Sequence, residues 1–198
     1  MGRVSVELML WREPEPITRD LARKGYLAAK KDAPGGTLPP YAGELPGKLT
    51  AYTGGHVLVT MDLESMDEMS GRVFAVAGAH GLVCYDPQRD LVHNAGPRGA
   101  YAGMQLHTGD GMIVTDPDLG LVHDALATLS AQNPFVALVN FGRHFMQVSP
   151  EPGGYELEYK EGGTLHRTLV PDLAEIQRAF GEYARDERGF LTRLAWSS

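Results

Sequence analysis

The sequence contains a single cysteine, Cys84, and no run of about 18 apolar residues that would span a membrane. One cysteine excludes an intramolecular disulfide and a zinc site built from cysteines, and it is typical of a reducing compartment. The first residues, MGRVSVELMLW, lack the basic and then apolar pattern of a secretion signal. These absences predict a cytoplasmic protein that does not associate with a membrane.

Basic residues are also in deficit. The 198 residues include 18 Lys and Arg against 25 Asp and Glu, so the formal net charge is −7. Surfaces that bind nucleic acid directly are basic, and this balance argues against such a surface. Hydrophobic residues make up 43% of the chain, which is enough to form a core. We expect an ordered, acidic globular protein that makes no direct contact with nucleic acid.

The usual motifs of catalysis and cofactor binding are missing. The seven histidines never show the HExxH spacing that places two imidazoles on one helix face. No serine occupies a Gly-x-Ser-x-Gly turn, and GELPGK lacks the spacing of a phosphate-binding loop. The sequence therefore predicts no metal site, no cofactor and no enzyme of a recognisable class.

Residues 1–98 are predicted to form an N-terminal unit with the element order βαβαββ. Apolar and polar residues alternate from Val4 to Leu10, which is typical of a half-buried strand. The segment 33–55 has the glycine and proline content of a loop. This order predicts a small sheet with its helices on one face. The other predicted elements are a helix over Thr18–Lys31, a strand over His56–Asp62, a helix with a Ser65–Glu68 capping box, and strands over Leu82–Asp86 and Leu91–His93.

Residues 99–117 are rich in glycine and are predicted to be a loop, and residues 118–198 a second unit of the order α-ββββ-α. Asp118 is placed to cap its first helix, and Asp172 its last. Short turns join the four strands between them, which favours an antiparallel meander. The fold class is therefore α+β, with two small antiparallel or mixed sheets, each packed by helices. The sequence leaves open whether the sheets are continuous. The predicted strands are Phe135–Phe141, His144–Ser149, Tyr155–Lys160 and Leu165–Val170.

Two groups of carboxylates are candidates for a binding surface. The first falls within seven residues that include no base, and the second lies on one face of a predicted strand, opposite its apolar residues. Three interpretations stay open: a solvated surface, a carboxylate pair for general acid–base catalysis, or an acidic surface that docks on a basic partner. The two groups are Asp62, Glu64, Asp67 and Glu68, and Glu156 and Glu158.

Two further residues have alternative interpretations. Cys84 lies in an apolar strand and is predicted to be buried, although a nucleophile assisted by His80 is the enzymatic alternative. Trp196, near the end of the chain, is either part of the core or part of an interface, where tryptophan is enriched.

The C-terminal third resembles a known family in four segments. These are the runs Gly153–Gly162, Leu165–Thr168, Asp172–Phe180 and the closing Leu194-Ala-Trp196. Together they resemble bacterial polymorphic-toxin immunity proteins of the type associated with deaminase toxins. In the N-terminal half, Ala79 to Gln88 is similar to a segment of uncharacterised actinobacterial proteins, for which no activity follows.

The resemblance implies a small cytosolic α+β inhibitor that occludes a cognate toxin and performs no catalysis. It implies no cofactor and no catalytic residue, and it carries over no contact residue, because the binding surface varies within the family. From the charge of the chain we expect contacts at the carboxylates named above, with a basic, nucleic-acid-acting toxin as the partner. Trp196 is added as an expected contact because tryptophan is enriched at interfaces. The alternatives are an enzyme that uses Cys84 with His80 or a carboxylate pair, and a module that forms homo-oligomers; the oligomeric state stays open.

Overall fold

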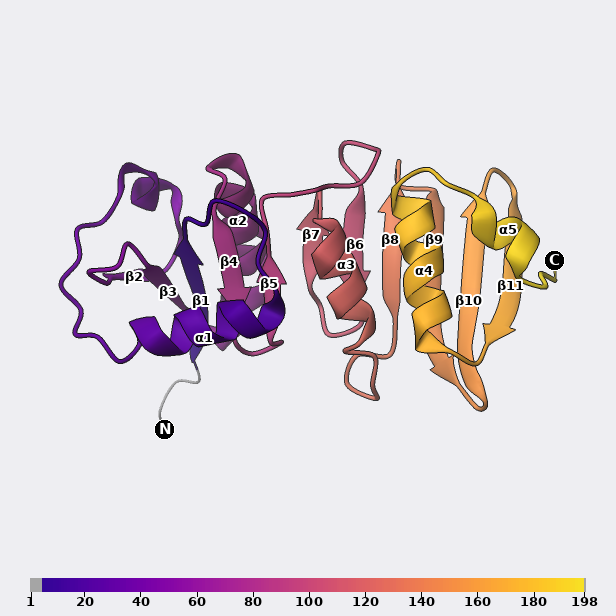
Figure 1. Cartoon of the computed structure of the whole chain (residues 1–198), viewed down its shortest axis with the longest axis horizontal. Helices are drawn as coiled ribbons and strands as arrows, with labels where there is room; N and C mark the ends of the chain where they lie inside the picture. The colour runs from indigo at the N-terminus through magenta and orange to yellow at the C-terminus, as the bar shows by residue number, and fades with distance from the viewer. Residues whose placement is uncertain (1–4, 198) are drawn as a thin grey trace. The chain divides into compact units, whose positions relative to one another are not determined.

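The alternating N-terminal segment is the central strand of a five-stranded antiparallel sheet (Figure 1). The computed structural model describes residues 5–197, so Val4 of the predicted strand lies outside the described residues. The five strands, in spatial order, are β2 (Lys48–Ala51), β3 (Val57–Asp62), β1 (Ser5–Trp11), β4 (Val83–Asp86) and β5 (Leu91–His93). Two short 3-10 segments, Pro40–Glu44 and Leu63–Ser65, lie in the connections.

The two helices of this sheet, α1 (Arg19–Ala29) and α2 (Met66–Ala79), pack on opposite faces (Figure 1). Ala22 and Ala29 of α1 share a core with Trp11. On the other face, Phe74 of α2 stacks on His93, with 3.9 Å between ring centroids. The prediction of helices on one face was wrong, because β1 is apolar and buried on both sides and needs a cover on each.

The helix ends are formed only partly as predicted. The Thr18 hydroxyl accepts a hydrogen bond from Leu21 N and caps α1. Ser65 stands at the start of α2, but its hydroxyl donates to the Asp62 carbonyl at 3.2 Å and makes no cap bond with the helix. The predicted Ser65–Glu68 capping box is therefore wrong.

A second antiparallel sheet of six strands begins after residue 98 (Figure 1). Its strands, in spatial order, are β11 (Thr164–Val170), β10 (Gly154–Glu161), β9 (His144–Glu151), β8 (Val136–Asn140), β6 (Gln105–Thr108) and β7 (Ile113–Thr115). The chain divides into unit 1, Met1–Pro97, and unit 2, Arg98–Ser198. The α+β class is confirmed, and the meander of β8 to β11 is present with the short turns that were predicted.

Two of these strands, β6 and β7, lie inside the segment 99–117, which was predicted to be a loop. Buried Leu106 and Val114 face each other across the pair. The turn Gly109 to Gly111 between them contains two of the four glycines of the segment. A loop assignment based on glycine was therefore wrong for this segment, because two short strands flank a glycine-rich turn.

The helices of unit 2 are α3 (Leu119–Leu126), α4 (Leu173–Ala184) and α5 (Gly189–Arg193), and Figure 1 shows α3 and α4 on the same side of the sheet. In the described part of unit 2, no helix covers the other side, which we call the open face. Strand alternation and register assign the following side chains to the open face: Gln105, His107, Ile113, Thr115, Ala137, Val139, Phe145, Gln147, Ser149, Glu156, Glu158, Lys160, Leu165, Arg167 and Leu169.

The cap of α3 provides a test of the fold. The Asp118 carboxylate is 3% exposed and accepts a hydrogen bond from Leu121 N at 3.0 Å. We expect Asp118→Ala to lower the free energy of unfolding by about 1–2 kcal/mol, because it removes a buried cap. Thr18→Ala, which removes the longer and exposed cap of α1, is the control and should cost about 0.5 kcal/mol. Equal losses in urea denaturation would contradict the assignment.

Candidate functional site

The open face of unit 2 combines charged and apolar side chains. Glu158 lies on β10, next to the edge strand β11, and its carboxylate accepts a hydrogen bond from Arg167 Nε at 2.7 Å and another from Gln147 Nε2 at 3.4 Å. Glu156 shares the open face with Glu158, opposite buried Leu157, as the alternation predicts. Its carboxylate has no ion pair within residues 5–197, so it is the less neutralised of the two.

Apolar side chains occupy much of the same surface. Phe145, Val139 and Leu165 lie in one row across β9, β8 and β11, in register with Lys160. Leu169 is 57% exposed at the edge of the sheet. A mixture of exposed apolar groups and hydrogen-bonded charges is typical of a protein interface, in which apolar contacts supply affinity and charges fix the register.

The four carboxylates of unit 1 lie where β3 ends and α2 begins. Asp62, Glu64, Asp67 and Glu68 are all exposed, and the 48% exposed Leu63 lies among them. Glu64, Asp67 and Glu68 form no ion pair with any residue that the structure describes. Asp67 and Glu68 lie in the first turn of α2, where negative charge suits the helix dipole, and this accounts for part of their placement.

Trp196 lies in an aromatic cluster on the helix-covered side of unit 2. Its ring centroid is 6.1 Å from those of both Tyr159 and Phe190, and its indole N–H donates to the Phe190 carbonyl at 3.1 Å. Phe190 is fully buried. These contacts favour the core interpretation of Trp196 over a role in an interface.

The structure does not bring Cys84 and His80 together. Cys84 is fully buried in β4, and burial raises the pKa of its thiol well above the usual value. His80 Nε2 lies 2.9 Å from a Glu44 carboxylate oxygen, and its ring lies against Tyr41. A nucleophilic cysteine needs a depressed pKa and access to substrate, and Cys84 has neither feature.

This burial predicts how Cys84 reacts. In the native protein at pH 8, we expect a thiol reagent such as DTNB to modify Cys84 only as fast as unit 1 opens. In urea above the unfolding transition, modification should finish within the time of the unfolding reaction itself. The rates are measured by absorbance, with free cysteine as the reference. Fast native labelling, within about tenfold of free cysteine, would restore the nucleophile interpretation.

No group of three or more His, Cys, Asp or Glu side chains is arranged to hold a metal ion between residues 5 and 197. Within the same range, no helix is long and apolar enough to cross a membrane.

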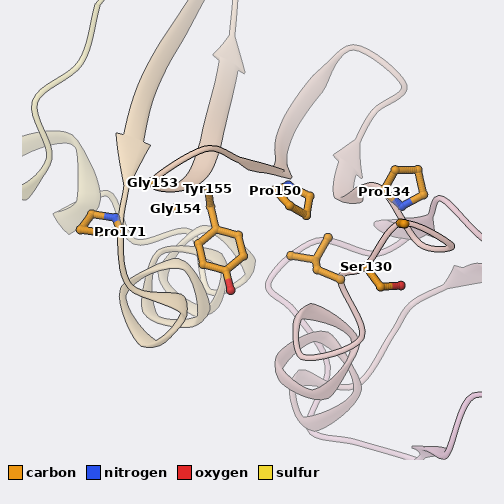
Figure 2. A pocket seen from close by; sticks show the side chains of 9 residues that line it. Ser130, Pro134, Pro150, Gly153, Gly154, Tyr155 and Pro171 are labelled. Atoms are coloured by element: carbon orange, nitrogen blue, oxygen red, sulfur yellow. The ribbon is translucent and has the colours of Figure 1, made fainter.

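Two surface features of unit 2 were not predicted from the sequence. Phe141, in the turn between β8 and β9, is 66% exposed and has a backbone φ of 53°, which is unusual for an aromatic residue. The Tyr101 ring packs edge-on against it, at 5.5 Å between centroids. The second feature is a hollow of about 590 Å³ around Tyr155, at the end of the sheet where β9 turns into β10 (Figure 2).

Signals for both features are present in the sequence. Phe141-Gly142 places a large aromatic residue in a tight turn, where exposure is expected. Tyr155 follows Pro150-Glu-Pro-Gly-Gly154, a rigid turn next to an aromatic residue.

Comparison of the chain with protein-family models, with characterised proteins and with solved structures finds no match.

Proposed function

We propose that the protein is a noncatalytic immunity protein that binds and blocks a cognate bacterial toxin in the cytoplasm. The toxin would be a basic protein that acts on nucleic acid, such as a deaminase. The observation that carries this proposal is the open face, a six-stranded surface that its own unit leaves without a helix layer. Sheets of this kind usually bury one face and expose a polar one, whereas this face also presents Phe145, Leu165 and Leu169.

The size of the open face indicates how the partner binds. Strands about 4.8 Å apart give the six-stranded sheet a width of roughly 24 Å, and strands of about six residues give it a length of roughly 20 Å. The resulting area of roughly 500 Å² is less than the roughly 800 Å² that each partner buries in a stable complex. A toxin that covers the open face is therefore expected to extend over an end of the sheet as well.

Charge supports a basic partner. The net charge of the chain is −7, and a protein that binds nucleic acid presents a basic surface. Opposite charges steer association, so the rate of complex formation should fall as salt is added. The exposed carboxylates at the start of α2 and Glu156 on the open face are the groups that would meet that surface.

The proposal is tested by finding the toxin and measuring protection. Tagged protein is recovered from its bacterial host, and the proteins bound to it in stoichiometric amount are identified by mass spectrometry. The toxic domain is then purified, and its activity on nucleic acid is measured with increasing amounts of the immunity protein. We expect full inhibition at a molar ratio near one. Failure to inhibit any stoichiometric partner would contradict the proposal.

Charge variants then locate the contact. We expect the double variant Glu156→Lys, Glu158→Gln to weaken toxin binding by about tenfold or more, with most of the change in association at low salt. The double variant Asp67→Lys, Glu68→Lys tests in the same way whether the carboxylates of unit 1 contact the toxin. Asp32→Lys, an exposed acidic residue outside both groups, is the matched control. Equal affinities for all three variants and the wild type would remove the electrostatic part of the proposal.

A further inference from the structure

The hollow at the end of the second sheet is built from three separate segments of unit 2. Its lining includes the loop after α3, the turn between β9 and β10, and the junction of β11 with α4. Figure 2 shows the Tyr155 ring standing within it, with Pro171 on one side and Pro150, Ser130 and Pro134 on the other. A volume of about 590 Å³ is large enough for a long side chain of a partner protein.

The walls of the hollow are stiff. Three of its residues are prolines, Pro134, Pro150 and Pro171, whose rings fix the backbone. Gly154 has a φ of 151°, and a Cβ there would lie 2.4 Å from the Val170 carbonyl oxygen. The turn is therefore held against the end of β11. A rigid, preformed hollow loses little conformational freedom when it is filled.

The chemistry of the hollow suits a cation with an apolar stem. The Tyr155 hydroxyl has no hydrogen-bond partner within residues 5–197, and the face of its ring can attract a cation. The Ser130 hydroxyl accepts a bond from Asn133 N at 3.2 Å and lies in the same lining. Prolines and Leu129 supply apolar contacts for methylene groups.

The charge of the residues around the hollow also favours a cation. The lining segments and the residues next to them, 128–135, 149–156 and 170–172, contain three carboxylates and no lysine or arginine. They are Glu151, Asp172 and Glu156, of which Glu156 points to the open face and not into the hollow. Glu151 and Asp172 are exposed, and the Asp172 carboxylate is fixed by the hydrogen bond it accepts from Ala174 N at 3.0 Å. An uncompensated negative rim around an aromatic hollow favours a positively charged occupant.

From these features we infer that the hollow binds an arginine side chain presented by a basic protein partner. Arginine fits better than lysine because its planar guanidinium stacks on an aromatic ring, is weakly hydrated, and donates several hydrogen bonds to hydroxyl and carboxylate oxygens. The inference rests on the proposed function, in which that arginine belongs to the toxin. Tyr155 and Glu156 are adjacent in β10 and point to opposite faces of the sheet. A partner that extends past the end of the open face therefore reaches both.

The site is tested first without any toxin. ¹⁵N-labelled protein is titrated with N-acetyl-L-arginine N-methylamide, with the matched citrulline, lysine and leucine amides as controls. We expect saturable shifts of the amide signals of the non-proline residues in 129–134 and 150–155 and of Asp172, with a dissociation constant in the millimolar range. Citrulline has the same shape without the charge and should bind about tenfold more weakly or worse. No shifts, or equal shifts with the leucine or citrulline amide, would overturn the inference.

Variants separate the site from the fold. Tyr155→Leu keeps an apolar side chain and should abolish the shifts, and Glu151→Gln should weaken them severalfold. Phe141→Leu, which changes an exposed aromatic residue in another turn, is the matched control and should leave them unchanged. Unchanged circular dichroism and thermal midpoint show that each variant is folded. Arginine binding that survives Tyr155→Leu would overturn the inference.

Binding measurements with the toxin found by the recovery experiment distinguish this inference from the proposed function. If the toxin binds and is inhibited but Tyr155→Leu leaves its affinity unchanged, the inference fails and the proposed function stands. If the arginine amide binds in the hollow but no stoichiometric partner is inhibited, the site stands and the proposed function fails. A loss of toxin affinity of about tenfold or more with Tyr155→Leu supports both.

Discussion

Lowering the pH from 7 to 5 is expected to reduce the free energy of unfolding of unit 1 by about 2 kcal/mol through one residue, His93. This histidine is the last residue of β5 and is buried against α2, where its ring stacks on Phe74. Neither ring nitrogen has a hydrogen-bond partner in the described part of the chain. Burial, with a smaller effect from the nearby Arg89 guanidinium, lowers the pKa of His93 to about 3.

The direction of the effect follows from the two states. An unfolded histidine has a pKa near 6.5, whereas that of folded His93 is about 3. Between pH 6.5 and about pH 3, the unfolded chain therefore binds a proton at this residue and the folded chain does not. Stability from the neutral His93 is therefore complete above pH 6.5 and is lost as the pH falls toward 3. Burial raises the pKa of Asp86, and proton uptake by the folded Asp86 acts in the opposite direction. A variant that removes His93 is therefore needed to assign the change in stability between pH 7 and 5 to this histidine.

The measurement needs a signal from unit 1 alone. The chain has two tryptophans, Trp11 in unit 1 and Trp196 in unit 2, so Trp196→Phe leaves Trp11 as the fluorescent reporter. Urea denaturation of this background at pH 7, 6 and 5 gives the stability of unit 1. Adding His93→Leu should raise it by about 1 kcal/mol at pH 7, because two unpaired polar atoms leave the core, and should flatten the pH dependence. His123→Gln, on the surface of α3, is the control. An unchanged pH slope with His93→Leu would contradict the prediction.

The elements with strict alternation or clear caps were predictable from the sequence. In β10, the polar Glu156 and Glu158 alternate with apolar Leu157, and this two-residue period assigned the faces without any tertiary information. The Asp118 and Asp172 caps were equally local, because each requires only an acceptor before an apolar helix. The position of Glu156 and Glu158 on one face of the sheet is therefore the part of the candidate site that could be predicted from the sequence.

Features that depend on distant contacts were not predictable in this way. Glu182 of α4 is 7% exposed and accepts two hydrogen bonds at 2.9 Å from Arg193 of α5. Arg193 holds the pKa of Glu182 below its usual range. This ion pair exists because α5 folds back on α4, which no local pattern in α4 encodes. The hollow around Tyr155 is of the same kind, because its three segments are far apart in the sequence.

The close approach that forms one wall of this hollow predicts a large effect of a small substitution. Gly154→Ala is expected to lower the free energy of unfolding of unit 2 by about 3 kcal/mol or more. A φ of 151° is open almost only to glycine, and a Cβ there would lie 2.4 Å from the Val170 carbonyl oxygen and 2.7 Å from Pro171 Cα. Both are backbone atoms, so neither can move away by a change of rotamer.

Gly163→Ala is the matched control, because that glycine lies in the turn between β10 and β11 with no atom within 4 Å of an added Cβ. This substitution should change the free energy of unfolding of unit 2 by about 0.5 kcal/mol or less. Hydrogen exchange measured by mass spectrometry compares β10 and β11 with β1 and β3 of the same molecule, so unit 1 serves as the internal reference. With Gly154→Ala, exchange should quicken in β10 and β11 and stay unchanged in β1 and β3. Equal protection in the two variants would mean that the turn can relax away from β11, and the hollow would then lose the rigid wall on which its affinity for an arginine side chain depends.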